Sequence, residues 1–130
     1  VTVIQDSYNA NADSMREAIR LLAETPHEGG RKVLVLGAMY ELGSYADDHH
    51  HRVAEEAAAS GADVVIFYGP EFEAAVNEIG QGRRIRLAES FEELSRIVSD
   101  AVRTGDLVLL KGSRGTRLER LLPLLTEGRE

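Results

Sequence analysis

The sequence lacks several features that would identify a class of protein by themselves. It contains no cysteine, which excludes disulfides and thiolate metal sites. No apolar run approaches the roughly 18 residues of a membrane-spanning helix, and the first residues show no signal-peptide pattern. Positive charge is also scarce, and the net charge of −7 argues against non-specific binding to nucleic acid or to an anionic membrane surface. We therefore expect a cytoplasmic protein.

Two glycine-rich nucleotide-binding motifs are missing as well. The P-loop pattern G-x-x-x-x-G-K-[ST] requires a lysine after the glycines, whereas Lys111 precedes Gly112 and Gly115. No G-x-G-x-x-G motif follows an apolar run, so the sequence does not support a nicotinamide cofactor. If the protein serves a nucleotide-dependent reaction, the main contacts to the triphosphate lie elsewhere.

The chain does contain a regular alternation of short apolar runs and helical patterns. Its 130 residues suffice for one domain with a single core. Runs such as 33–36 and 64–67 are apolar throughout, as in strands buried on both faces. The alternation predicts a Rossmann-like α/β fold, an open, mostly parallel sheet with helices on both faces. The expected strands are 2–5, 32–36, 63–68, 84–87 and 107–110, and the expected helices are 13–24, 46–60, 70–79, 91–103 and 116–125.

The exit from the first strand is rich in polar side chains. The segment from Asp6 to Asn11 brings a carboxylate, a phenol, a hydroxyl and two carboxamides into one short loop before a helix. Because ligands of open α/β sheets bind at the carboxyl ends of the strands, this loop is a candidate binding site. An alternative is that its Asp and Asn residues only turn the chain and cap the helix.

The loop after the second strand runs from Gly37 to Ser44 and leads into three consecutive histidines. Glu41 is its only carboxylate. Side chains that follow one another in a helix point about 100° apart, so the histidines at 49–51 cannot converge on one metal ion. We expect no metal site here, although one of these histidines can still face the binding site.

A basic loop follows the fifth strand. Over residues 111–120, four cations (Lys111, Arg114, Arg117 and Arg120) stand against Glu119 alone. Glycines that run into a helix N-terminus predict an anion site formed by backbone N–H groups and the helix dipole. The alternative is an exposed, solvated basic loop.

Three segments together resemble the C-terminal domain of the Mur ligases. They are DSYNANADSM at 6–15, VLGAMYELG at 35–43 and LLKGSRGTRLE at 109–119, and the resemblance extends from Val1 to about Leu125. Within that family, the resemblance points to members that use ATP and Mg²⁺ to join D-alanyl-D-alanine to UDP-N-acetylmuramoyl-tripeptide in peptidoglycan precursor synthesis. Residues 1–130 would then be the lid domain, excised from a three-domain enzyme whose central ATPase domain and metal ligands lie outside this sequence.

The same resemblance implies roles for individual residues. Asp6 would bind the ATP ribose, and Tyr8, Asn9 and Asn11 would line the nucleotide side of the cleft. Lys111, Ser113 and Arg114 would face the dipeptide, with Glu41 and His50 nearby, although a structural role for His50 is equally compatible. No catalytic residue is expected in this domain alone, so the isolated domain should be inactive.

The chain departs from the family pattern at two positions. Ala12 stands where a proline is usual, and Ala38 replaces an acidic residue beside the cleft. A diverged ligase with another amine acceptor is therefore an alternative.

Two further alternatives share the fold. A receiver domain would explain Asp6 and Lys111, but its phosphorylatable aspartate is missing from Tyr68-Gly69-Pro70. A stand-alone binding module remains compatible with the fold, because fold alone does not determine function.

Overall fold

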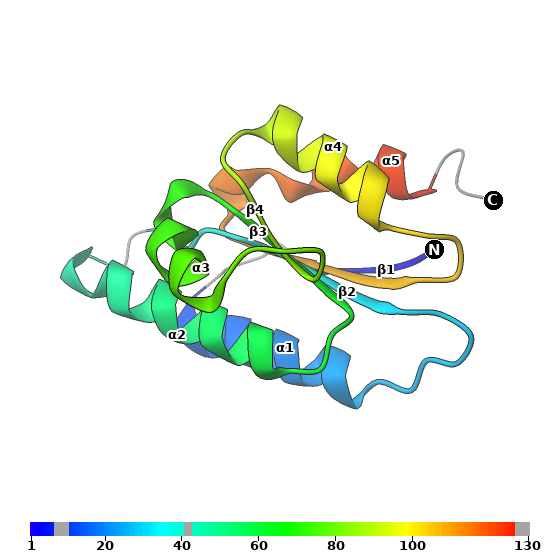
Figure 1. The fold of residues 1–130 in the computed structure, drawn as a ribbon, viewed down its shortest axis with the longest axis horizontal. Coiled ribbons are helices and arrows are strands. Elements are labelled where there is room, and N and C mark those ends of the chain that lie inside the picture. Colours follow the sequence, from blue (N-terminus) through cyan, green and yellow to red (C-terminus); the bar gives the residue numbers. More distant parts are fainter. Residues whose placement is uncertain (7–10, 41–42, 127–130) are drawn as a thin grey trace.

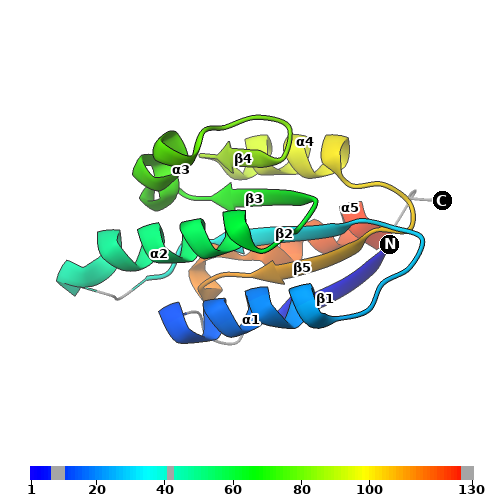
Figure 2. The same cartoon turned by 60° about the horizontal axis from the view of Figure 1, so that its bottom comes forward.

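In the computed structural model, which describes residues 1–6, 11–40 and 43–126, five parallel strands form one sheet (Figures 1 and 2). The strand order is β1-β5-β2-β3-β4. The strands are β1 (Thr2–Asp6), β2 (Lys32–Gly37), β3 (Val64–Tyr68), β4 (Ile85–Ala88) and β5 (Leu107–Lys111). The α-helices are α1 (Ala12–Glu24), α2 (Ala46–Ala59), α3 (Glu73–Ile79), α4 (Phe91–Ala101) and α5 (Leu122–Thr126). The predicted fold class is confirmed.

Helices cover both faces of the sheet, as Figure 2 shows, and each face has its own apolar layer. Successive strand residues point to opposite faces. In β2, Leu34 and Leu36 therefore pack with α1, α2 and α3, whereas Val33 and Val35 pack with α4 and α5. The uninterrupted apolar run of this strand thus reflects burial on both sides.

Side-chain caps determine where two helices begin. The Asn11 carbonyl oxygen Oδ1 accepts from the Ser14 N–H at 2.9 Å, and the Asn11 N–H donates to the Ser14 hydroxyl at 3.1 Å. Ser90 caps α4 by accepting from the Glu93 N–H at 3.1 Å. The Glu93 carboxylate in turn accepts from the N–H of Glu89 at 2.7 Å.

The expectation of one continuous helix over 116–125 is wrong. The chain instead forms two 3₁₀ turns, η3 (Arg114–Thr116) and η4 (Leu118–Leu121), before the short helix α5. Arg117 separates the turns with a left-handed backbone, at φ 52°. A single helix would also place Pro123, which has no N–H to donate, in its interior, whereas the short α5 keeps this proline in the first turn.

A 3₁₀ turn at Pro70 was also not predicted from the sequence. Residues Pro70–Phe72 form η2, so α3 begins three residues later than the sequence predicts.

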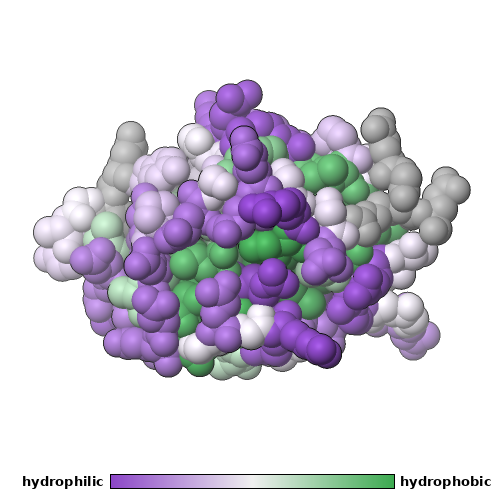
Figure 3. Space-filling model, turned by 45° about the horizontal axis from the view of Figure 1, so that its top comes forward, coloured by the Kyte–Doolittle hydropathy of each residue, from purple (hydrophilic) through white to green (hydrophobic). Residues whose placement is uncertain are grey.

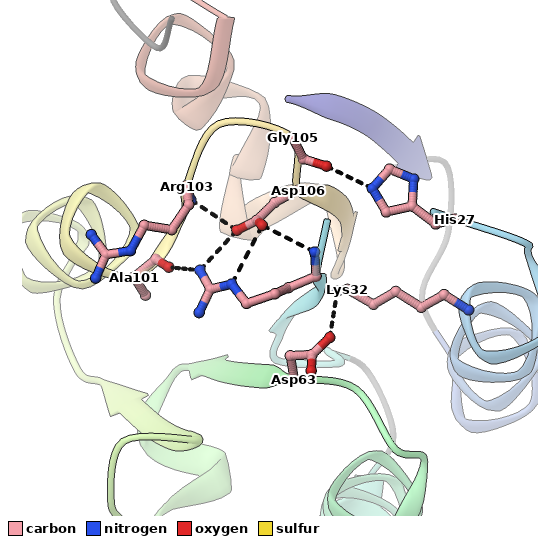
Figure 4. A network of polar contacts seen from close by, with 8 residues as sticks. His27, Lys32, Asp63, Ala101, Arg103, Gly105 and Asp106 are labelled. Carbon is pink, nitrogen blue, oxygen red and sulfur yellow. Dashed lines mark hydrogen bonds and ion pairs between the residues drawn. The ribbon is translucent and has the colours of Figure 1, made fainter. Parts of the chain in front are cut away.

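A polar network joins the amino ends of the strands (Figure 4). The buried Asp106 carboxylate accepts from the Arg31 guanidinium at 2.9 Å and from the Arg103 N–H at 2.8 Å. Arg31 also donates to the carbonyl of Ala101, at the end of α4. The beginnings of β2 and β5 and the end of α4 are thereby held together, at the edge opposite the polar loops.

The surface over α4 is largely hydrophilic, with hydrophobic residues showing between charged ones (Figure 3). Among the described residues, no helix combines the length and hydrophobicity required to cross a membrane.

Candidate functional site

The strand order brings the three polar loops to the same edge of the sheet. β5 lies between β1 and β2, and Lys111 at its end is in register with Asp6 on one side and Leu36 on the other. The chain leaves β1 and β2 toward the face covered by α1 to α3, but leaves β5 toward the opposite face. Such a change of direction between neighbouring strands opens a crevice, which is where ligands of open α/β sheets bind.

Two hydrogen bonds connect the loop after β2 with the loop after β5. The Ser113 N–H donates to the Ala38 carbonyl at 3.1 Å, and the Tyr40 N–H donates to the Ser113 hydroxyl oxygen at 2.8 Å. The two loops approach so closely that a Cβ on Gly112 would lie 2.8 Å from the Cα of Gly37. Only glycine fits this contact, which explains why the loops carry glycines where they cross.

His50 positions the loop after β2. Its side chain is 1% exposed, and its Nε2 accepts from the Met39 N–H at 2.9 Å. Nδ1 lies 2.6 Å from the Ala46 carbonyl, so the neutral tautomer with the proton on Nδ1 satisfies both contacts. Both ring nitrogens are thus engaged by the protein itself, and we interpret His50 as a positioning residue rather than a substrate ligand.

The other two histidines point elsewhere. His51 pairs with Glu78 of α3, and this hydrogen bond raises the pKa of His51 above its usual value. The ring of His49 lies beside that of Tyr45, with the ring centroids 6.3 Å apart. As expected from helix geometry, the three side chains do not converge. In the described part of the chain, no group of three or more His, Cys, Asp or Glu side chains could hold a metal ion.

The basic loop differs from its expected form. The N–H groups of Ser113, Thr116 and Arg117 all donate to carbonyls within the protein, and the next residues form 3₁₀ turns instead of an α-helix. The predicted anion site of backbone N–H groups and a helix dipole is therefore wrong for these three amides. Arg114, whose side chain is exposed, is the candidate for contact with an anion.

The positive charge of this loop is also less concentrated than the sequence suggests. Lys111 is 1% exposed. Arg120 donates to the Thr116 carbonyl of η3 at 3.0 Å, and its guanidinium lies over the ring of Phe91 in α4, 3.7 Å from the ring centroid. Of the four cations, Arg114 and Arg117 are thus the exposed ones.

Several predicted contacts to the nucleotide or the dipeptide fall outside the described residues. Tyr8 and Asn9 lie in the segment 7–10, and Glu41 lies in the segment 41–42. The backbone of Asp6 ends β1 beside Lys111. The Oδ1 of Asn11 is occupied by its cap, so the capping alternative holds for that oxygen.

Sequence reasoning missed one carboxylate at this edge, that of Glu71. It follows β3 in η2, and its Oε1 is buried without a hydrogen-bond partner in the described part of the chain. A Cβ built on Gly69 would lie 2.7 Å from this oxygen and 3.0 Å from the Cβ of Ala38. Burial first, and then the charge of Glu71, raise the pKa of the neighbouring Tyr40. The available signal was a glutamate three residues after the end of a buried strand.

Comparisons with known proteins agree with this arrangement of loops. The family model described as "Mur ligase, glutamate ligase domain" matches residues 1–114. The UDP-N-acetylmuramoyl-tripeptide–D-alanyl-D-alanine ligase of Treponema pallidum is 46% identical over 132 residues, covering 99% of this chain and 28% of the relative. The ligase of the same name from Escherichia coli is 36% identical over 96% of this chain and 27% of its own length.

Solved structures resemble the chain in the same way. MurF from Acinetobacter baumannii superposes with a TM-score of 0.81 at 29% identity, covering 96% of this chain and 28% of that one. The MurF ligase of Thermotoga maritima, solved in complex with ADP, gives a TM-score of 0.71 at 30% identity, over 94% of this chain and 27% of that one. The chain therefore spans little more than a quarter of the length of the proteins that it matches.

Proposed function

Because this chain belongs to the Mur ligase family, we propose that it is the C-terminal domain of an ATP-dependent ligase that joins D-alanyl-D-alanine to UDP-N-acetylmuramoyl-tripeptide. The observation that carries the proposal is the 46% identity to the Treponema pallidum ligase over 99% of the chain. The remaining three quarters of such a ligase, including a central ATPase domain, would lie outside this sequence. ATP, when bound there, would supply the phosphoryl group that activates the tripeptide carboxylate.

The nucleotide side of the site would be formed by the loop after β1. Asp6 is the candidate for the ribose hydroxyls, because a carboxylate can accept hydrogen bonds from both. Tyr8, Asn9 and Asn11 would complete this side. The ADP-bound Thermotoga maritima ligase supports a nucleotide role for the family, since the chain matches that structure over 94% of its length.

The acceptor side would be formed by the loop after β5. The exposed guanidinium of Arg114 can bind the carboxylate of a dipeptide through paired hydrogen bonds. Ser113, whose oxygen already accepts from the Tyr40 N–H, retains its own O–H for donation. Lys111 is buried at the end of β5 and would influence ligand binding by positioning this loop. We propose that Mg²⁺ is held by the rest of the ligase.

The test uses the full-length ligase that contains this chain, with phosphate release as the readout. We expect Asp6→Ala to raise the KM for ATP and Arg114→Ala to raise the KM for D-alanyl-D-alanine, each by about tenfold or more, because each removes a charge-assisted hydrogen bond. Arg83→Ala, an exposed arginine at the amino edge of the sheet, is the matched control and should leave both constants unchanged.

Two results would contradict parts of the proposal. If the full-length protein turns over other amines but not D-alanyl-D-alanine, the family assignment stands and the acceptor is wrong. If the isolated chain of 130 residues hydrolyses ATP or forms product by itself, its assignment as a dependent lid domain is wrong.

A further inference from the structure

Glu71 holds a carboxylate in place without a counter-ion. Its Oε1 is buried and has no hydrogen-bond partner within the described residues, and none of the ion pairs formed there includes Glu71. A charged oxygen that loses water without gaining a partner is unfavourable, and a nearby cation would offset that cost. The Glu71 carboxylate can therefore bind a positively charged ligand group at the exposed side of the residue.

The backbone of Gly69 leaves room for the Glu71 carboxylate. Gly69 has a φ of 128°, which L side chains rarely adopt. A Cβ on Gly69 would lie only 2.7 Å from the Glu71 Oε1. The carboxylate therefore lies over bare glycine backbone, and a larger residue at position 69 would displace it.

This carboxylate belongs to the same edge as the proposed acceptor loop. The Cβ built on Gly69 would lie 2.7 Å from the Glu71 Oε1 and 3.0 Å from the Cβ of Ala38, so Glu71 and Ala38 are neighbours. The Ala38 carbonyl in turn accepts from the Ser113 N–H at 3.1 Å. Ala38 thus stands between a carboxylate on one side and the loop that carries Arg114 on the other.

The surroundings of Glu71 also favour a cation. Glu71 lines a hollow of about 410 Å³ between α2 and α3, in which three carboxylates (Asp47, Glu71 and Glu73) stand against one basic side chain, that of His51, which is already paired with Glu78. A ligand with an ammonium group and a carboxylate could therefore place its ammonium group at Glu71 and its carboxylate at Arg114.

We propose that Glu71 determines acceptor specificity by binding the ammonium group of the incoming amine, while Arg114 binds the carboxylate. The ligand class is a zwitterionic amino acid or short peptide with a free primary amine. This inference rests on the proposed function, and it adds a residue from the loop after β3 to a site otherwise formed by the loops after β1, β2 and β5.

The first test is Glu71→Gln in the full-length ligase, which preserves the shape of the side chain and removes its charge. We expect the KM for D-alanyl-D-alanine to rise about tenfold or more, with the KM values for ATP and UDP-N-acetylmuramoyl-tripeptide unchanged. Propionyl-D-alanine, which lacks the amine, should inhibit the variant and the wild type equally well. Glu92→Gln, an exposed glutamate on α4, is the matched control.

A second variant separates ligand binding from a structural role. Because Ala38 and Glu71 approach the same point, an aspartate at position 38 would return a carboxylate to nearly the same place. We expect Glu71→Ala to raise the KM for the dipeptide as Glu71→Gln does, and the double variant Glu71→Ala/Ala38→Asp to recover most of that loss.

The outcomes distinguish this inference from the proposed function. Glu71 has no such role if Glu71→Gln leaves the KM of the amine within twofold, or if it raises all three KM values alike. If the ligase ignores D-alanyl-D-alanine but uses another amine, and Glu71→Gln raises the KM for that amine, the proposed substrate is wrong and the role of Glu71 stands.

Discussion

At the scale of single residues, the main finding is that His50 positions the loop after β2 from a buried place in the fold. The sequence places it near the ligand-binding edge, and a role in contacting substrate was one expectation. The structure instead buries its ring and gives both nitrogens backbone partners, Met39 and Ala46. It therefore connects the beginning of α2 to the loop after β2, which in turn contacts the loop that carries Arg114.

We expect His50→Ala to destabilise the domain by about 2–3 kcal/mol, because the buried Met39 N–H would lose its acceptor and a cavity would remain. Urea unfolding of the 130-residue chain measures this change as a lower midpoint with an unaltered slope. His49→Ala, one position earlier and more exposed, should change stability by less than about 0.5 kcal/mol. Equal effects of the two substitutions would contradict the positioning role.

At the scale of elements, the segment after β5 departs most from its prediction. Its residues have good helical periodicity, with Leu118, Leu121 and Leu125 all buried on one side. The left-handed Arg117 nevertheless divides the segment, and the resulting turns direct Arg114 and Arg120 to different places. The break thus separates a cation that can face a ligand from one that packs on α4.

Substitutions at Arg117 test whether this break is inherent in the fold. A β-branched residue tolerates the left-handed region poorly, so we expect Arg117→Val to destabilise the domain by about 1 kcal/mol or more. Arg117→Gly should be neutral or slightly stabilising, since glycine adopts a φ of 52° without strain. Thermal unfolding compares the two, with Glu119→Val as the control at a nearby exposed position. Similar melting temperatures for Arg117→Val and Arg117→Gly would contradict the assigned backbone.

At the scale of the whole molecule, the amino edge of the sheet contributes to stability, whereas the carboxyl edge carries the candidate ligand contacts. At the amino edge, the buried Asp106 joins the partly buried Arg31 and the N–H of Arg103 (Figure 4). The carboxyl edge carries the loops with the candidate ligand contacts.

We expect Asp106→Ala to destabilise the domain by about 3 kcal/mol or more, because the guanidinium of the partly buried Arg31 and the backbone N–H groups of Arg31 and Arg103 would all lose this acceptor. Asp63→Ala is the control. The exposed Asp63 accepts from the Lys32 N–H at 2.8 Å, and its loss should cost about 1 kcal/mol. In the full-length ligase, Asp106→Ala should leave the KM for ATP unchanged, so a raised KM would contradict the division of tasks between the edges.

The sequence by itself determined the five strands, their parallel orientation and the existence of the helices between them. Apolar runs such as 33–36 require burial on both faces, and the strand–helix alternation requires parallel strands, so the polar loops must share one edge. The cap of α1 was also readable, because helix capping was one interpretation of the loop that ends at Asn11. These features depend on side chains close together in the chain, which is why periodicity and short motifs reveal them.

Only the tertiary structure decided which loops meet. The insertion of β5 between β1 and β2 places Lys111 beside Asp6 and buries it, and the packing of η2 brings Glu71 against Ala38. These contacts join residues far apart in sequence, and their geometry depends on how the layers pack rather than on any local preference. For the same reason, the surface charge of the basic loop could not be read from its composition, because burial removes Lys111 and a turn redirects Arg120.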